Sequence, residues 1–278
     1  MLTDVLINGE KKHNLDITDR GLQYGDGLFE TIEVTSGRAV FISRHLDRLQ
    51  LGCKQLFIPY PGDTVLLSEI DLLLEGIESA VLKIQLTRGQ GGRGYRQPEI
   101  IEPTRILSLY PFPAFPECYK QEGVRVRLCS GRLSSNSSLA GIKHTNRLEQ
   151  VLARAEWVSE SIQEGLMFDQ QGYLVEGTMS NVFMVKDGIL LTPLLVNCGV
   201  AGIIRGIILD YGAENGFHVE PQLLTKEHLY RADEVFLTNS IIGIWPVSHI
   251  DNYSLSVGAV TRQISQCVDQ LKTQDIQS

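Results

Sequence analysis

A proline-rich segment at residues 111–117, PFPAFPE, interrupts an otherwise regular pattern of short strands and helices. Three of its seven positions are proline, which fixes φ and removes the backbone donor that a helix or a central strand needs. The segment therefore has the character of a linker. We predict an N-terminal domain at residues 1–112, a linker at 113–119 and a C-terminal domain at 120–278.

The N-terminal half has the pattern of hairpins mixed with helices. Asn8-Gly9, between two short stretches of alternating character, is the strongest short signal for a hairpin turn. A second turn is expected at Ser36-Gly37. Further strands are expected at residues 28–34, 39–41, 81–87 and 105–110, and helices from about residue 44 and over 65–76.

The C-terminal half alternates strands, hairpins and helices. Strands are expected at residues 124–128, 165–168, 173–175, 181–185, 189–192 and 234–238, and helices from about residues 148, 203, 226 and 257. Asp187-Gly188 marks another hairpin turn. The fold class predicted from both halves is α/β, or α+β, in two domains.

Composition and charge narrow the function classes. The net charge of −8 and the absence of a basic run argue against binding to nucleic acid or to an anionic membrane. The five cysteines are scattered without the spacing of a metal or redox site, which is typical of reduced thiols in a cytoplasmic protein. No apolar run is long enough to span a bilayer. We therefore expect a cytoplasmic protein without a metal site.

One lysine stands in an unusual place, in the segment LAGIKHTNRLEQVL at residues 139–152. Helical spacing begins at Leu148, and Asn146 with Glu149 has the form of a capping box. Lys143 therefore lies just before a helix, among small and apolar residues. A solvated lysine is one explanation. The other is a lysine held in a pocket, where its amine serves as a nucleophile or a base.

Other segments carry polar groups that suit a single kind of site. They are Glu176 in EGTMSN, the glycine-bearing turn GVAGIIR at 199–205, the strand end Thr238-Asn239-Ser240, and Arg44 with Arg48 on one helix face. Pyridoxal phosphate needs a lysine, an acid against its pyridine nitrogen and an anion cradle for its phosphate. Helix caps, strand ends and solvated charges explain the same residues individually, so both interpretations stay open on the residues alone.

Six motifs in order resemble those of the fold-type IV pyridoxal-phosphate enzymes. They are YGDGLFET at 24–31, RHLDRL at 44–49, TRGQGGRGY at 87–95, LAGIKHTNRLEQ at 139–150, VEGTMSNVF at 175–183 and GVAGIIRG at 199–206. This family includes branched-chain aminotransferases, D-amino-acid aminotransferases and 4-amino-4-deoxychorismate lyases. The resemblance covers nearly the whole chain. It implies two α/β domains with the cofactor in the cleft between them, and a homodimer.

The resemblance also implies roles for individual residues. Lys143 matches the lysine that holds pyridoxal phosphate as a Schiff base, and Glu176 matches the partner of the pyridine nitrogen. The phosphate is then expected at Arg48, Gly202, Ile203, Ile204 and Ser240. His45, close to Arg48, is expected either to orient the cofactor or substrate or to serve the fold alone.

Within the family, GGRGY and AGIKHTNRLEQV are most similar to the aminodeoxychorismate lyases. Thr31 stands where that branch carries a threonine thought to deliver a proton to the departing enolpyruvyl carbon. A β-branched residue that simply suits a strand is the structural alternative for Thr31. The resemblance thus implies conversion of 4-amino-4-deoxychorismate to 4-aminobenzoate and pyruvate, a step that supplies folate precursors.

Arg93 is the candidate for gripping a substrate carboxylate, because a guanidinium fork matches that group. Its neighbours Gly91, Gly92 and Gly94 permit close approach of a ligand. Tyr95 is expected in the same pocket. Arg88 is a weaker candidate, since its place at a strand end suits structural pairing equally well. A solvated loop arginine is the alternative for Arg93.

Two other functions remain open at this point. An aminotransferase for D-amino acids or branched-chain amino acids would use the same Lys143 and Glu176 and exchange the amine with a 2-oxo acid. A protein that binds pyridoxal phosphate without catalysis is the other, and the complete catalytic set argues against it.

Overall fold

The computed structural model describes residues 4–277, and side chains are described throughout except at 213–215. It divides into two compact units. Unit 1 comprises residues up to Pro113 together with 142–146 and 274 onward, and unit 2 comprises 114–141 and 147–273. The division follows Pro113, inside the proline-rich segment. Lys143 was expected within a C-terminal domain, but its short segment groups with unit 1 instead.

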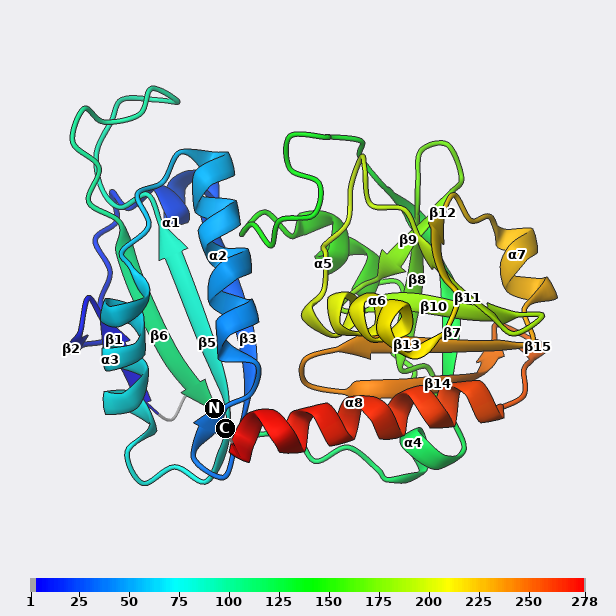
Figure 1. Cartoon of the computed structure of the whole chain (residues 1–278). Coiled ribbons are helices and arrows are strands. Elements are labelled where there is room, and N and C mark those ends of the chain that lie inside the picture. Colours follow the sequence, from blue (N-terminus) through cyan, green and yellow to red (C-terminus); the bar gives the residue numbers. More distant parts are fainter. Residues whose placement is uncertain (1–3, 278) are drawn as a thin grey trace. The chain divides into compact units, whose positions relative to one another are not determined.

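Unit 1 contains a six-stranded antiparallel sheet with the order β2-β1-β6-β5-β3-β4 (Figure 1). Its strands are β1 (Asp4–Ile7), β2 (Glu10–Lys11), β3 (Gly27–Thr35), β4 (Arg38–Ala39), β5 (Ser79–Thr87) and β6 (Thr104–Tyr110). Asn8 and Gly9 form the predicted hairpin turn, with φ of 53° and 81°. Ser36 and Gly37 form the second, with φ of 53° and 73°. Both turns have the paired positive φ that fits the twist of a hairpin.

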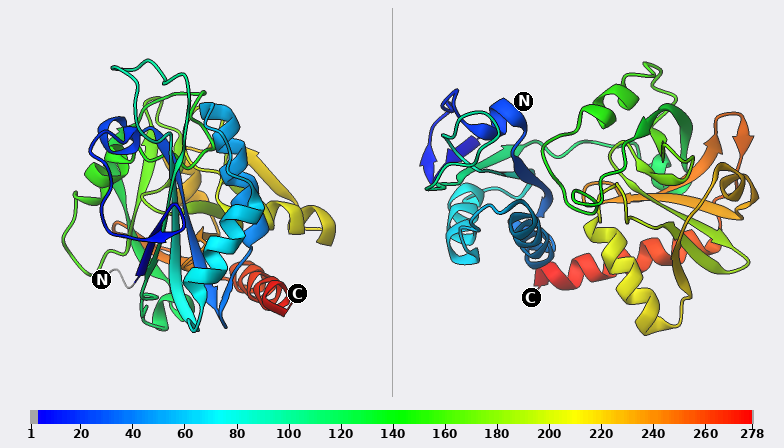
Figure 2. Two further views of the ribbon diagram at one scale, coloured as in Figure 1. Left: turned by 90° about the vertical axis from the view of Figure 1, so that its left-hand side faces the viewer. Right: turned by 90° about the horizontal axis from the view of Figure 1, so that it is seen from above.

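Helices cover one face of this sheet. They are α2 (Ile42–Leu56) and α3 (Asp63–Leu74), and a short α1 (Arg20–Tyr24) precedes β3. Figure 2 shows α2 and α3 on the same side of the strands. The apolar side of α2, with Leu46, Leu49 and Cys53, is buried, as the helical spacing predicts. Alternate residues of β3 point to these helices, and the others point to the opposite face.

Unit 2 contains a nine-stranded mixed sheet with the order β12-β11-β10-β13-β14-β7-β8-β9, and β15 pairs with β14. The strands are β7 (Val124–Leu133), β8 (Glu164–Asp169), β9 (Leu174–Gly177), β10 (Asn181–Lys186), β11 (Ile189–Pro193), β12 (Val219–Gln222), β13 (Glu234–Asn239), β14 (Gly243–Ile250) and β15 (Tyr253–Ser254). The helices are α4 (Cys118–Gln121), α5 (Leu148–Arg154), α6 (Ile203–Asn215), α7 (Lys226–Arg231) and α8 (Ala259–Gln277). The last residues of α8 group with unit 1.

The start of α5 differs from the prediction in its cap. The helix begins at Leu148 as expected, but no side chain of the described residues caps it. The Asn146 amide donates to the Gly25 carbonyl at 2.8 Å. Glu149 accepts from the Ser134 backbone at 2.9 Å. The predicted capping box is therefore wrong, because both of its side chains bond to segments that are distant in the sequence.

Candidate active site

Lys143 lies on a short segment that extends the edge of the unit 1 sheet. Leu28 of β3 and His144 form an antiparallel bridge. The Phe29 amide donates to the Lys143 carbonyl at 2.9 Å, and the Thr145 amide donates to the Gly27 carbonyl at 3.0 Å. Lys143 is half-buried, and its Nζ lies 4.3 Å from the centre of the Phe29 ring. Backbone pairing therefore fixes the lysine against β3.

Thr31 lies on the same face of the sheet as Lys143. Because Leu28 pairs with His144, Lys143 is opposite Phe29, and residues two apart on a strand share a face. Thr31 is half-buried, as are Phe29 and Lys143. The structure thus places the two residues predicted to move protons, an amine and a hydroxyl, on one face of the sheet, two strand positions apart.

Lys83 of β5 is a member of this face that the sequence analysis missed. It pairs directly with Thr31 in the register of β3 and β5. Its Nζ lies 5.5 Å from the centre of the Phe29 ring, so two ammonium groups, those of Lys83 and Lys143, flank one aromatic ring. The signal in the sequence is the lysine within the apolar strand VLKIQLT. Because side chains alternate along a strand, such a lysine lies on the less buried face.

Arg48 lies on the helix-covered face of the sheet, where it is paired with Glu30 of β3. Burial lowers the pKa of the neighbouring His45, and Lys143, at the edge of the sheet, is close enough to this group for its charge to lower that pKa further. Arg48 Nε donates to Glu30 Oε1 at 2.8 Å, and Nη2 donates to Oε2 at 2.5 Å. Glu30 is 1% exposed. Two of the five N–H donors of the guanidinium therefore bind this carboxylate. Glu30 was not singled out in the sequence, because an acid in an alternating strand reads as a solvent-facing residue.

His45 completes this buried group. Its Nδ1 lies 2.6 Å from Glu30 Oε2, and the ring is fully buried. Burial raises the pKa of the Glu30 carboxyl, but attraction to Arg48 and the hydrogen bond with His45 outweigh it and lower the pKa to about 2. Burial lowers the pKa of His45, and Glu30 offsets only part of that effect. Glu30 is therefore an anion, and it orients the side chains of His45 and Arg48 on α2.

Glu176 lies in unit 2 on β9 and is buried. Its Oε2 accepts from the Val200 backbone amide at 2.8 Å, and its Oε1 accepts from the side-chain Nε2 of Gln150 at 3.2 Å. Burial lowers the pKa of the Arg147 guanidinium, while the nearby Glu176 carboxylate acts in the opposite direction. These contacts hold the carboxylate beside the glycine-bearing turn at 199–202.

The glycine-bearing turn leads directly into α6. The Gly202 amide donates to Asn181 Oδ1 at 3.1 Å, and Asn181 Nδ2 donates to the Val200 carbonyl at 2.8 Å. A Cβ at Gly202 would lie 2.0 Å from Asn181 Oδ1, so only glycine fits. No side chain of the described residues caps the start of α6 at Ile203. A helix start of this kind offers backbone N–H groups and a positive dipole end to an anion.

The end of β13 lies on the same face as this turn. Thr238 pairs with Asn181 across β10 and β13, so both side chains point to one side. Within residues 4–277, the Thr238 hydroxyl is buried and has no hydrogen-bond partner. Asn239 Oδ1 accepts from the Ile241 and Ile242 amides at 2.8 Å and shapes the turn that contains Ser240. Ser240 is half-buried in that turn.

Glu164 is a second buried acid that the sequence analysis missed. Its carboxylate accepts from the Thr178 amide at 3.1 Å, the Thr178 hydroxyl at 2.5 Å, the Met179 amide at 3.1 Å and the Ser180 hydroxyl at 2.9 Å. It therefore fixes the turn that directly follows β9. This turn joins the strand of Glu176 to the strand of Asn181, so Glu164 fixes the connection between the two.

The glycine loop, defined as residues 89–98, carries Arg93 and Tyr95 in unit 1. Both side chains are exposed, Tyr95 by 88%. The loop leaves the sheet between β5 and β6 (Figure 1). Arg88, just before it, is structural: its guanidinium donates to Asp26 at 2.8 and 3.0 Å and to the carbonyls of Leu56 and Phe57 at the end of α2. The pairing alternative for Arg88 is therefore the observed one.

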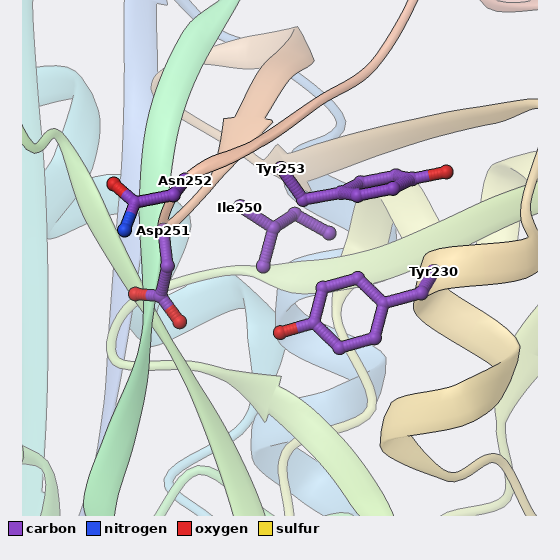
Figure 3. Close-up of a pocket in the computed structure, with 5 residues that line it drawn as sticks. All are labelled: Tyr230, Ile250, Asp251, Asn252 and Tyr253. Atoms are coloured by element: carbon purple, nitrogen blue, oxygen red, sulfur yellow. The ribbon is translucent and has the colours of Figure 1, made fainter.

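A separate pocket of about 470 Å³ lies in unit 2 at the β14–β15 turn (Figure 3). It is lined by Tyr230, Ile250, Asp251, Asn252 and Tyr253. None of the candidate site residues lines it. Among the described residues there is also no cluster of three or more His, Cys, Asp or Glu side chains that could hold a metal ion. No helix within residues 4–277 has the length and apolar character needed to cross a membrane.

Comparison with known proteins agrees with the motif pattern. The family model for class IV amino-transferases matches residues 27–250. An aminodeoxychorismate lyase of Vibrio harveyi is 36% identical over 93% of this chain and 97% of its own length. A putative branched-chain-amino-acid aminotransferase of Methanocaldococcus jannaschii is 31% identical over 97% and 96%. The crystal structure of 4-amino-4-deoxychorismate lyase from Pseudomonas aeruginosa superimposes with a TM-score of 0.91 at 44% identity, covering 96% of this chain and 98% of that one.

Proposed function

The chain belongs to the class IV aminotransferase family, and from this premise we propose that it is a pyridoxal-phosphate-dependent aminodeoxychorismate lyase. It would convert 4-amino-4-deoxychorismate to 4-aminobenzoate and pyruvate. Two similar proteins that carry this name span nearly the whole chain at 36% and 44% identity. The structural observation that carries the proposal is the placement of Lys143 and Thr31 on one face of the unit 1 sheet.

The residues of this chain fit pyridoxal phosphate. The start of α6 has no side-chain cap among the described residues, and the Thr238 hydroxyl lies buried without a partner on the face that Asn181 shares. Both features suit a phosphate with several acceptor oxygens. Lys143, Glu176, Arg48, Gly202, Ile203, Ile204 and Ser240 would hold the group. When bound, it supplies an aldehyde for the substrate amine and an electron sink for the carbon that bears it.

Lys143 and Thr31 would divide the proton transfers of the reaction. The neutral amine of Lys143 removes the proton from the ring carbon that bears the substrate nitrogen. The neighbouring carbon–oxygen bond then breaks, the electron pair leaves with the enolpyruvyl oxygen, and the ring becomes aromatic. Thr31 or Lys143 delivers a proton to the methylene carbon of the departing enolpyruvate, which yields pyruvate. Positioned groups of this kind contribute about 10²–10⁴-fold to a rate.

Cationic side chains would bind the two substrate carboxylates. Arg93 on the glycine loop is the candidate from the sequence, with the neutral Tyr95 beside it in the same pocket. Lys83 is added because it pairs with Thr31 on the face that Thr31 shares with Lys143. A protein with a net charge of −8 does not attract a dianion by its overall field, so local cations must do so. Lys83 would bind a carboxylate beside Thr31, on the face that also carries Lys143.

A homodimer in the cytoplasm is the further part of the proposal. On α5, Leu148, Val151 and Leu152 are 75%, 59% and 70% exposed, and contiguous apolar surface of this kind is typical of an interface. The five cysteines are scattered without the spacing of a redox or metal site, which supports a reducing compartment. The product, 4-aminobenzoate, would then supply folate synthesis.

An aminotransferase is the second candidate function, favoured by the 31% identity to a putative branched-chain enzyme over nearly the whole chain. A product assay separates the two. The loaded protein is given aminodeoxychorismate without any 2-oxo acid, and 4-aminobenzoate and pyruvate are measured. Equal amounts of both, and neither with Lys143→Ala, support the lyase. Glutamate formed from 2-oxoglutarate and an amino donor, with no 4-aminobenzoate, would establish the aminotransferase instead.

A further inference from the structure

Arg20 of α1 is a buried cation at the base of the glycine loop. Only 3% of the residue is exposed. Its Nε donates to Asp26 Oδ2 at 2.9 Å, and its guanidinium carbon lies 4.9 Å from the centre of the Tyr24 ring. One edge of the guanidinium is therefore fixed by a carboxylate and one face by an aromatic ring. This leaves its Nη1 pointing at the loop.

Nη1 of Arg20 contacts three backbone carbonyls of the glycine loop. The distances are 3.0 Å to Gly94, 3.3 Å to Arg96 and 3.4 Å to Gly91. The Arg20 amide also donates to the Gly89 carbonyl at 2.9 Å. The loop thus wraps around one nitrogen, Nη1, with acceptors on both sides of Arg93. A buried cation of this kind needs such acceptors, because its desolvation is otherwise costly.

The loop closes tightly on this guanidinium. At Gly92, where φ is +80°, an added Cβ would lie 3.0 Å from Arg20 Nη1 and 2.5 Å from the Arg96 carbonyl. The residues between Gly91 and Arg96 form no strand or helix. Their conformation therefore depends on contacts such as those with Arg20. Tyr95 in turn meets Tyr24 edge to face, with ring centres 5.5 Å apart.

We propose that Arg20 is a positioning residue for substrate recognition: by binding the carbonyls on either side of Arg93, it sets the loop conformation in which Arg93 and Tyr95 meet the substrate carboxylates. The proposal rests on the proposed function, because it takes these two side chains as the carboxylate grip. Arg20 itself does not touch the reacting atoms. Its loss should therefore weaken substrate binding and leave the proton transfers intact.

Arg88 supplies a matched control. It shares Asp26 with Arg20, at 2.8 Å from Nε to Oδ2, and it is equally buried at 3% exposed. Its remaining N–H groups bind the carbonyls of Leu56 and Phe57 and not those of the glycine loop. Arg88→Gln therefore removes an equivalent buried cation and lowers stability without changing the contacts that order the loop.

The test compares Arg20→Gln, Arg20→Lys and Arg88→Gln in the protein loaded with pyridoxal phosphate. Two experiments are made: steady-state kinetics, which gives KM and kcat for aminodeoxychorismate, and trypsin digestion, which gives the rate of cleavage after Arg93 and Arg96. We expect Arg20→Gln to raise KM on the order of tenfold with kcat within about twofold, the signature of lost binding alone. Cleavage in the loop should accelerate severalfold in the same variant. Arg20→Lys keeps the charge and one donor direction. Its KM and its cleavage rate should therefore lie between those of Arg20→Gln and wild type.

Equal KM values and equal cleavage rates in the Arg20 and Arg88 variants would overturn the proposal. If Arg20→Gln does not fold, the same comparison is made between Arg20→Lys and Arg88→Lys, with the same two outcomes. If wild type forms no 4-aminobenzoate, the proposed function fails and the substrate part of the proposal fails with it. The cleavage rates then still decide, separately, whether Arg20 orders the loop.

Discussion

The guanidinium of Arg48 and the carboxylate of Glu30 form a two-point ion pair on the helix-covered face of the unit 1 sheet, with distances of 2.8 and 2.5 Å. Glu30 is buried and Arg48 is half-buried, and His45 adds a third contact to the same carboxylate. Arg48 is the residue expected at the cofactor phosphate. A guanidinium fixed at two points by an anion is already oriented before any phosphate binds, so Glu30 defines where the remaining donors of Arg48 point.

Replacing Glu30 by Gln should destabilise the protein in a pH-dependent way. At neutral pH the change leaves Arg48 without its buried anion, at a cost on the order of 3 kcal/mol. The folded pKa of Glu30, about 2, lies below the unfolded value of 4.5. The stabilisation is therefore complete above about pH 4.5 and is lost as the pH falls towards 2. The Tm difference between wild type and Glu30→Gln should shrink over that range.

Glu33→Gln is the control for this experiment, because Glu33 lies on the same strand and on the other face. Its Tm should stay within a few degrees of wild type at neutral pH. A Tm difference between wild type and Glu30→Gln that is constant from pH 7 to pH 2.5 would contradict the assigned pKa and the anionic state of Glu30.

Gly202→Ala should weaken binding of pyridoxal phosphate. The new Cβ would lie 2.0 Å from Asn181 Oδ1, so Asn181 must move and release the Gly202 amide and the Val200 carbonyl. Loss of one such buried polar arrangement costs about 1–3 kcal/mol, and we expect Kd for the cofactor to rise roughly tenfold or more. Titration of the cofactor-free protein, followed by absorbance, measures this.

Gly206→Ala is the matched control on the same helix. A Cβ at Gly206 meets nothing within 4 Å, and alanine favours a helix over glycine by about 1 kcal/mol. This variant should bind the cofactor as wild type does and unfold at a slightly higher temperature. Equal cofactor affinity in the Gly202 and Gly206 variants would show that the start of α6 is not the phosphate site.

The exposed side of α5 should prove to be an interface between two copies of the chain. Leu152→Glu places a charge in the middle of the apolar residues Leu148, Val151 and Leu152, and burying that charge would be costly. We expect light scattering to give twice the chain mass for wild type and half that value for the variant at micromolar concentration. Leu51→Glu, an exposed leucine on α2, should leave the mass unchanged. A monomeric wild type would contradict the homodimer.

Local signals in the sequence predicted much of the fold. The Asn8-Gly9 and Ser36-Gly37 turns need backbone angles that few residues adopt, so their positions could be predicted from residue type alone. The strand β14 was not predicted, although it lies in the middle of the unit 2 sheet. It contains Pro246, which lacks a backbone donor and normally indicates an edge strand. Here the pairing of β14 with β13 and β7 outweighs the local preference.

The candidate site was predictable where it depends on motifs and not where it depends on pairing. Lys143, Glu176 and the turn at 199–202 follow from resemblance of continuous segments. The roles of Glu30 and Arg20 could not be predicted in this way, because each acts on a residue that only folding brings close. Glu30 lies 18 positions before Arg48, and Arg20 lies 74 positions before Gly94. Their side chains look ordinary in the sequence, since an acid in a strand and an arginine at a turn both have solvated forms.

The most direct test of the proposed reaction is the turnover of Thr31→Val and Thr31→Ser on aminodeoxychorismate, with Lys143 intact. Valine keeps the strand and the shape of Thr31 but removes the hydroxyl that lies on the face of Lys143. With the absorbance of bound pyridoxal phosphate unchanged, we predict that Thr31→Val loses about 10²-fold in kcat and that Thr31→Ser regains most of it. Unchanged 4-aminobenzoate formation by Thr31→Val would contradict the account, and Thr31 would then be a strand residue with no part in the proton transfer.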